Sequence, residues 1–289
     1  MASYRLHGDC RHHYIRRSDV TVVDIDQLRT ANAAACAAFP WIRTDLTYPE
    51  NNITIGAPKT IAARIQELLY LNGAKTSIDG VYGAATEACV KEFQGRWPQH
   101  LTATGKVDQD TYLLLCRPIL EAVQPVSSSN NFLTAVRLVA KQHLGLHPVE
   151  IGGQNKGPWV RLYMKGQQGT DYPWCAGFVS FVLKQAALST KTSPPVSYTF
   201  SCDDLAKEAK ARRIFVAETG HAANPSHFPA IFLCRKTPND WTHTGLVMDF
   251  RGDTFSTIEG NTNDSGSAEG YEVCGRTRGI ANKDFITLG

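Results

Sequence analysis

The stretch DYPWCAGFVSFVLKQAA, residues 171–187, decides the fold. Proline is tolerated in the first turn of a helix, so Pro173 predicts that a helix opens here. The residues that follow are apolar on nearly every side, which is typical of a helix buried at the centre of a domain. The sequence therefore predicts a central helix with Cys175 in its first turn.

From Ala230 onward the hydrophobic pattern changes to a period of two, which predicts β-strands. The predicted strands are AIFLCR at 230–235, HTGLVMDF at 243–250 and TFSTIEGN at 254–261. Upstream of the central helix, the apolar spacing over 132–144 predicts another helix. Helices that precede a group of neighbouring strands indicate an α+β domain with an antiparallel sheet.

The polar, serine-rich stretch QPVSSSNN at 124–131 is typical of a linker. Before it, helical spacing predicts short helices over 61–72 and 84–93, and a third that begins at Asp108 or Gln109 and ends before Pro118. The alanine-rich piece at 30–39 favours a helix, but its segment fits neither domain. The predicted division is an unassigned segment (1–56), a three-helix domain (57–120), a linker (121–131) and an α+β domain (132–289).

Composition narrows the class of protein. Hydrophobic residues make up 43% and charged residues 20%, as in soluble globular proteins, and no apolar run is long enough to span a bilayer. The formal charge of +3 comes without a basic tract. We therefore expect neither membrane insertion nor a nucleic-acid partner. The N-terminus lacks the features of a secretory signal, which favours synthesis in a reducing cytoplasm, where most of the eight cysteines stay free thiols.

Cys175 is the candidate nucleophile because of its predicted place at a helix start. A thiol attacks a carbonyl as its thiolate, and the unpaired N–H groups and dipole of a helix N-terminus favour negative charge. The backbone N–H of Cys175 would also serve in an oxyanion hole. The competing interpretation is that Cys175 is a buried structural cysteine, an interpretation that applies equally to each of the eight cysteines.

His243 is the candidate general base, since an imidazole must accept the thiol proton and later donate it to the leaving amine. It opens a predicted strand, and the short connection around Arg251 and Gly252 returns the chain alongside it. Depending on the register, either Glu259 or Asn261 then lies close to His243. A carboxylate or amide there would hold the ring in the useful tautomer.

In combination, four blocks resemble the CHAP family, the cysteine, histidine-dependent amidohydrolases and peptidases of bacterial cell walls, which have a papain-like fold. The blocks are GGQNKGPWV (152–160), DYPWCAGFVSFVL (171–183), HTGLVMDF (243–250) and TIEGNTN (257–263). The resemblance runs from about Phe132 to the C-terminus. It implies Cys175 as nucleophile, His243 as base, Glu259 as orienting group and Asn261 as a second polar support. The calcium-binding loop of some members is not recognisable, so neither a metal nor another cofactor is expected.

The N-terminal helical region resembles a second family, the small three-helix peptidoglycan-binding domain of many wall hydrolases. The stretches that carry this resemblance are IQELLYLNG (65–73), IDGVYGAATEACVKEFQ (78–94) and TGKVDQDTYLLL (104–115). The motif residues are expected to be structural: the turn glycines permit a backbone shape, and Phe93 belongs to the core. Peptidoglycan is therefore the expected partner.

Further residues are singled out with weaker support. Trp174 and Trp241 would stack on a sugar or peptide at the cleft, although core packing competes for Trp174. Asn155 is expected to line the same cleft, and Tyr172 to supply a second oxyanion donor. The spacing of His7, Cys10, His12 and His13 matches no closed zinc site, and the Arg-Gly-Asp triplet at 251–253 is typical of a turn.

These patterns together predict a peptidoglycan hydrolase that cleaves an amide bond, as an N-acetylmuramoyl-L-alanine amidase or as a peptide endopeptidase. Two alternatives remain: a non-catalytic wall-binding protein, and an acyltransferase on the same fold. Without a recognisable signal, delivery to the wall is expected by phage lysis, as an endolysin, or by injection into a rival cell, for instance by a type VI secretion apparatus. In the second case a cognate immunity protein is expected.

Overall fold

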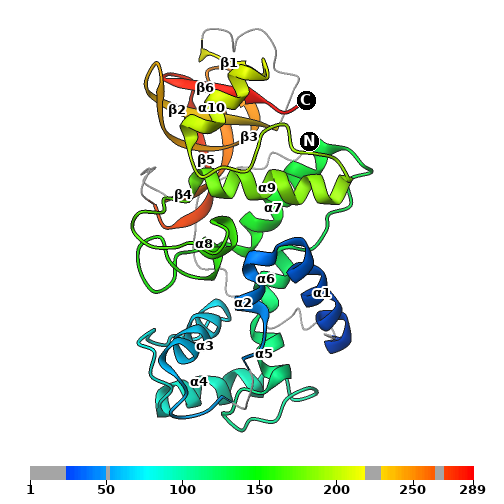
Figure 1. Ribbon diagram of the computed structural model, residues 1–289, viewed down its shortest axis with the longest axis vertical. Coiled ribbons are helices and arrows are strands. Elements are labelled where there is room, and N and C mark those ends of the chain that lie inside the picture. Colours follow the sequence, from blue (N-terminus) through cyan, green and yellow to red (C-terminus); the bar gives the residue numbers. More distant parts are fainter. Residues whose placement is uncertain (1–23, 50–52, 219–228, 264–269) are drawn as a thin grey trace, which may run out of the picture.

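The computed structural model describes residues 24–49, 53–218, 229–263 and 270–289. The molecule is elongated, with a group of short helices at one end, a β-sheet at the other and two long helices between them (Figure 1). The α+β fold class predicted from the sequence is confirmed. Among the described residues, every helix is too short or too polar to cross a membrane.

The sheet has six antiparallel strands in the order β1-β6-β2-β3-β4-β5. Three strands that are neighbours in this order, β2, β3 and β4, are the three that the sequence predicted. Their buried residues form nearly continuous runs and do not alternate, so the strands were predicted correctly but the period of two does not describe their burial. The bounds are β1 (Phe215–Val216), β2 (Ala230–Thr237), β3 (Asp240–Arg251), β4 (Thr254–Thr262), β5 (Glu272–Gly279) and β6 (Lys283–Thr287).

Helix α9 (Cys175–Thr190) lies across this sheet and is buried along most of its length, as its apolar sequence predicted. It packs on β3 and β4 on one side and on α7 (Phe132–Leu146) on another. The helix begins at Cys175, two residues after Pro173, with Trp174 as its N-cap. The nucleophile candidate is thus the first helical residue.

Two glycines let α9 and the strands approach closely. A Cβ on Gly260 of β4 would stand 2.6 Å from Cβ of Phe178 and 2.8 Å from the ring of Trp174. A Cβ on Gly245 of β3 would stand 2.7 Å from Cγ of Glu259. Side chains at these positions would push apart the first turn of α9, β3 and β4, so the glycines in the blocks HTG and EGN have a packing role.

The three predicted N-terminal helices are present as α3 (Lys59–Leu71), α4 (Ala84–Gly95) and α5 (Gln109–Leu115), followed by α6 (Arg117–Ala122). Two buried glutamines fix the turns that connect them. Gln66 accepts the Gly80 N–H at 2.9 Å, and Gln94 accepts the Gly105 N–H at 2.9 Å. Both glycines have positive φ, 75° and 76°, so the expected backbone role of the turn glycines is confirmed.

The described part of the segment before residue 57 contains α1 (Ile25–Ala38), the 3₁₀ turn η1 (Pro40–Ile42) and α2 (Arg43–Leu46). This segment takes part in the contacts that connect the helical end of the molecule with the end that contains the sheet. The guanidinium of Arg161, on α8 (Pro158–Tyr163), binds Asp45 of α2 at 2.9 Å and Glu67 of α3 at 2.7 Å. The Arg161 side chain is only 13% exposed, so these contacts are protected from water and salt.

The stretch expected to be a linker is also held in place. The side-chain amide of Gln185, on α9, donates to the carbonyls of Ala122 at 2.8 Å and Gln124 at 3.0 Å. The amide of Gln142, on α7, donates to the same two carbonyls at 2.8 and 3.2 Å. These bonds fasten the end of the three-helix region directly to the two long helices.

Candidate active site

Cys175 lies at the N-terminus of α9 with only 5% of its surface exposed. Its Sγ lies 3.9 Å from Sγ of Cys202, the first residue of α10 (Cys202–Ala211). The pKa of Cys175 is held well below the usual thiol value, chiefly by the hydrogen bond from Cys202 and also by His243 and the Ala176 N–H, against the effect of burial. The thiolate is therefore the favoured form.

His243 stands on β3 between the thiol and a carboxylate. Its Nε2 lies 2.8 Å from Oε2 of Glu259, and both side chains are almost fully buried. Burial opposes the charged ring, but the interactions with Cys175 and Glu259 outweigh it and raise the pKa of His243 to about 9. Because Nε2 is engaged by Glu259, Nδ1 is the ring nitrogen that remains for proton exchange with the thiol, and it has no hydrogen-bond partner among the described residues.

The register decides between the two partners that the sequence left open for His243. Leu246 of β3 pairs with Ile258 of β4, and the side chain of Glu259 reaches the ring. Asn261 is buried two residues further along β4, where its φ of 55° interrupts the extended strand. Strict alternation of faces therefore does not extend to Asn261, and its role as a polar support stays a prediction.

Two residues that the sequence did not suggest complete the surroundings of Glu259. Arg278 of β5 donates from Nε to Oε1 and from Nη2 to Oε2, both at 2.5 Å, and the Thr257 hydroxyl donates to Oε1 at 2.5 Å. Burial would raise the pKa of Glu259, but Arg278 and His243 lower it to about 2. The carboxylate is thus ionised and fixed in orientation.

The two tryptophans proposed to contact substrate are buried in the fold. Trp174 is fully buried, stacks on Tyr163 with ring centroids 5.5 Å apart, and donates its indole N–H to Glu150 at 2.9 Å. Trp241 is 7% exposed and donates to Asp284 at 2.9 Å. Both rings therefore pack within the fold, and their expected contacts with substrate stay predictions.

Asn155 and Tyr172 lie in the loops before α9. Asn155 has a left-handed φ of 51°, and its carbonyl accepts the Gly169 N–H at 2.7 Å. Its side chain is buried, and Oδ1 has no hydrogen-bond partner among the described residues. Tyr172 is half-buried, and its backbone N–H donates to Gly169. The expected roles of both at the cleft stay predictions.

A second buried histidine helps to distinguish function from packing. His143 of α7 lies between the hydroxyl of Tyr163 at 2.8 Å and the amide oxygen of Gln185 at 3.0 Å. Burial lowers its pKa to about 4, so the ring is neutral. Unlike His243, it contacts no carboxylate or thiol among the described residues, and we assign it a structural role.

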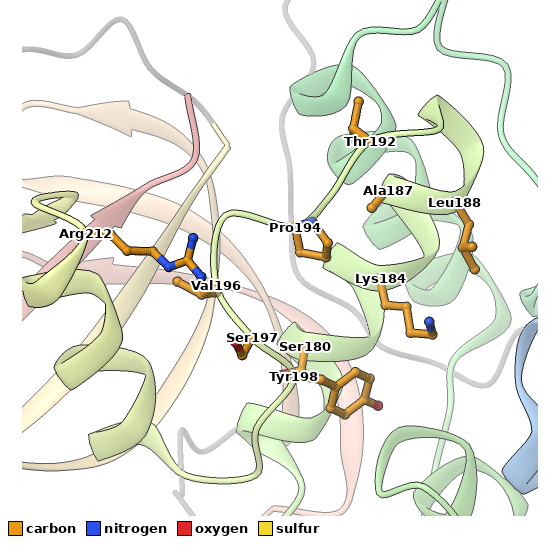
Figure 2. Close-up of a pocket in the computed structure, with 10 residues that line it drawn as sticks. All are labelled: Ser180, Lys184, Ala187, Leu188, Thr192, Pro194, Val196, Ser197, Tyr198 and Arg212. Atoms are coloured by element: carbon orange, nitrogen blue, oxygen red, sulfur yellow. The ribbon is translucent and has the colours of Figure 1, made fainter.

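A hollow of about 340 Å³ lies away from Cys175, between the later turns of α9 and the segment that follows it. Figure 2 shows Lys184 and Leu188 on the helix and Pro194 and Tyr198 on the segment. Its other cation, Arg212, already binds Glu208. Because none of the catalytic candidates lines this hollow, we assign it no part in the chemistry.

Within the described residues, no three metal-binding side chains gather at one place. The cluster of His7, Cys10, His12 and His13 lies outside the described residues. The cysteines within the described residues are all free thiols, as expected.

Comparison with known proteins gives a family match in the N-terminal half of the chain. Residues 57–115 match a family described as "Putative peptidoglycan binding domain". This match covers α3, α4 and α5 and supports association with the cell wall. No curated protein and no solved structure matches the chain.

Proposed function

We propose that this protein is a cysteine hydrolase that cleaves an amide bond of bacterial peptidoglycan. One observation carries the proposal: a buried histidine binds a fixed carboxylate through Nε2 and keeps Nδ1 without a hydrogen-bond partner among the described residues, while its ring helps to lower the pKa of a thiol at a helix N-terminus. This is the arrangement that nucleophilic cysteine catalysis requires. The family match at 57–115 supports peptidoglycan as the polymer on which it acts.

In the proposed reaction, the Cys175 thiolate attacks the amide carbonyl, and the imidazolium of His243 gives its proton to the leaving amine. The resulting thioester is attacked by water, whose proton His243 accepts. Expulsion of the thiolate releases the carboxylic acid and restores the ion pair. The backbone N–H of Cys175 and the α9 dipole would stabilise the oxyanion in both halves.

Positive and negative groups alternate from Arg278 to Cys175. Arg278 is positive, Glu259 negative, His243 positive in the resting pair and Cys175 negative, and the first two are in direct contact. Each charge has an opposite neighbour, so the buried set is neutral overall. Such pairing is what makes a buried ion pair tolerable in the low dielectric of a protein interior.

The scissile bond is proposed to be either the amide between N-acetylmuramic acid and L-alanine or a peptide bond of the stem or crosslink. The three-helix region would hold the enzyme on the polymer. Action as a phage endolysin or as a secreted antibacterial effector, with an immunity protein in the latter case, belongs to the same proposal.

Digestion of isolated sacculi tests it. The native protein should release soluble fragments, and Cys175→Ala should release none while still sedimenting with the wall. Cys89→Ala, which removes a half-buried thiol from α4, is the matched control and should behave as the native protein. Mass spectrometry of the fragments identifies the new amino group and hence the bond.

Three outcomes would count against the proposal. Equal release by native protein and Cys175→Ala excludes the mechanism. Sedimentation with the wall without any release favours a non-catalytic binder. Products that carry an added amine instead of a free carboxylate favour an acyltransferase.

A further inference from the structure

Two cysteine sulfurs are in contact at the candidate site. Sγ of Cys175 and Sγ of Cys202 lie 3.9 Å apart, and the two residues begin α9 and α10. Both are nearly buried, with 5% and 8% of their surfaces exposed. The catalytic scheme uses the thiol of Cys175 as nucleophile and needs no covalent chemistry from that of Cys202. A second thiol so close to a nucleophile therefore calls for an explanation.

The two thiols are in different protonation states. The pKa of Cys175 is held well below the usual thiol value, chiefly by the hydrogen bond that Cys202 donates. The pKa of Cys202 is raised well above that value, chiefly by the same contact and then by burial. The pair is therefore one thiolate and one thiol. Oxidants such as peroxides react with thiolates, so they would attack Cys175 first.

We propose that Cys202 is a resolving cysteine that converts an oxidised Cys175 into a reversible disulfide. The Cys175 thiolate attacks one oxygen of hydrogen peroxide, the O–O bond breaks, and the leaving hydroxide takes the proton of the His243 imidazolium to become water. Cys175 is then a sulfenic acid. The Cys202 sulfur attacks the Cys175 sulfur, the S–O bond breaks, and the hydroxide leaves with the Cys202 proton as a second water.

The geometry favours Cys202 over the other nearby thiol. A disulfide requires the sulfurs to approach to about 2.05 Å, which from contact distance is a short movement at the start of two helices. Cys234 of β2 pairs with His243 across the sheet and also lies near the site, but of these two thiols it is Cys202 whose sulfur contacts the Cys175 sulfur. The site thus assigns the resolving role to Cys202.

The consequence is protection of the nucleophile. A cysteine without a resolving partner proceeds from sulfenic to sulfinic and sulfonic acid, and the last two are not reduced by thiols. A Cys175–Cys202 disulfide would stop this series at a stage that a dithiol reverses. Oxidation would then switch the enzyme off without destroying it.

Intact-mass analysis after treatment with an excess of hydrogen peroxide tests the inference, because each oxygen atom added to a sulfur consumes one peroxide molecule. The native protein should lose two hydrogen atoms, and peptide mapping should join the peptide with Cys175 to the peptide with Cys202. In Cys202→Ser, Cys175 should instead gain two or three oxygen atoms. Cys234→Ser is the matched control and should form the same disulfide as the native protein.

Activity after reduction gives a second readout. Dithiothreitol should restore the peroxide-treated native protein and Cys234→Ser, but not Cys202→Ser. A link to Cys234, or the same oxygen additions in native protein and Cys202→Ser, would overturn the proposal. Thermal melting of Cys202→Ser and of Cys202→Ala shows whether either variant is folded before oxidation.

This inference rests on the proposed function, because both require a reactive Cys175 thiolate. The two proposals can nevertheless be disproved independently of each other. Linkage of the two cysteines is measured by mass and does not depend on any substrate. If the wall is cleaved and no disulfide forms, only the redox inference is wrong. If the disulfide forms and the wall stays intact, only the proposed function is wrong.

Discussion

Arg278 holds both carboxylate oxygens of Glu259, so the group that orients His243 is itself oriented from the neighbouring strand. Glu259 is completely buried, and the Arg278 side chain is 16% exposed. A carboxylate bound only to a histidine would lose its positively charged partner whenever that histidine gave up its proton. The bidentate arginine keeps it ionised whether His243 is charged or neutral.

Replacement of Arg278 should therefore weaken both stability and catalysis. We expect Arg278→Gln to lower the free energy of unfolding by about 3 kcal/mol, because it leaves a buried carboxylate without its main partner. Loss of the fixed ring orientation should lower kcat/KM by about 100-fold. Denaturant titration and kinetics on a soluble muropeptide measure the two effects. Arg251→Gln, at an exposed turn, is the control, and an equally small effect in both variants would contradict this role for Arg278.

The pH dependence of activity should show the ion pair. The reactive form needs the Cys175 thiolate, which exists above its lowered pKa, and the His243 imidazolium, which exists below its pKa of about 9. We expect kcat/KM to be level through neutral pH and to fall as the pH rises through about 9. In Glu259→Gln the fall should begin at lower pH, because the carboxylate that raises the His243 pKa is gone. An upper limb at the same pH in both proteins would exclude this coupling.

Cys202 should also control how acidic the nucleophile is. Its hydrogen bond is the largest cause of the lowered pKa of Cys175, so Cys202→Ala should raise that pKa. The rate of alkylation by iodoacetamide, followed across pH, reports the thiolate fraction. Cys116→Ala, which removes a buried thiol from the N-terminal region, should leave the profile unchanged. If both variants match the native profile, the contact does not stabilise the thiolate.

The close approach of β4 to α9 predicts a strong effect of a single methyl group. In Gly260→Ala the new Cβ would meet Phe178 and Trp174 at 2.6–2.8 Å, so the first turn of α9 must shift. We expect a loss of about 1–3 kcal/mol in stability, together with a loss of activity from the displaced thiol. In Gly275→Ala the nearest atom is 3.7 Å away, and this matched variant should be close to native in both measurements. Native activity in Gly260→Ala would show that the approach is not required.

Arg161 should be the most sensitive link between the two ends of the molecule. Arg161→Ala leaves Asp45 and Glu67 without the guanidinium that both share, and we expect a loss of about 3 kcal/mol. Calorimetry should show the helical region and the sheet region melting further apart in temperature than in the native protein. Arg43→Ala, at an exposed position of α2, is the control. A melting profile that Arg161→Ala shares with that control would mean that the contacts do not couple the regions.

Local patterns in the sequence were enough to predict much of this fold. The apolar character of α9, β3 and β4 follows from burial, which the sequence carries directly. Cys175 was found because its neighbours mark a helix start. His243 was found as the start of a predicted strand, although β3 begins three residues earlier, at Asp240. The choice between Glu259 and Asn261 was not available, since it depends on a register that local pattern fixes only to about one residue.

The remaining features depend on contacts between segments distant in the sequence. Arg278 lies on β5, which was not among the predicted strands, so nothing placed its guanidinium beside Glu259. Cys202 follows Ser201, a helix-capping residue, and this marks a helix start as clearly as the sequence around Cys175 does. What could not be seen was that the two helix starts meet. The burial of Trp174 and Trp241 likewise comes from partners elsewhere, Glu150 and Asp284.

The glutamine-fixed turns of the N-terminal region have a consequence for the order of folding. Gln66 and Gln94 bind glycines only 14 and 11 residues away, so each turn can close as soon as its own helix and the next few residues exist. The candidate active site instead joins α9, β3, β4 and β5, and cannot assemble until almost the whole chain has been made. During synthesis the wall-binding region would therefore be complete first. A nascent or truncated chain would recognise its polymer before it acquired the means to cut it.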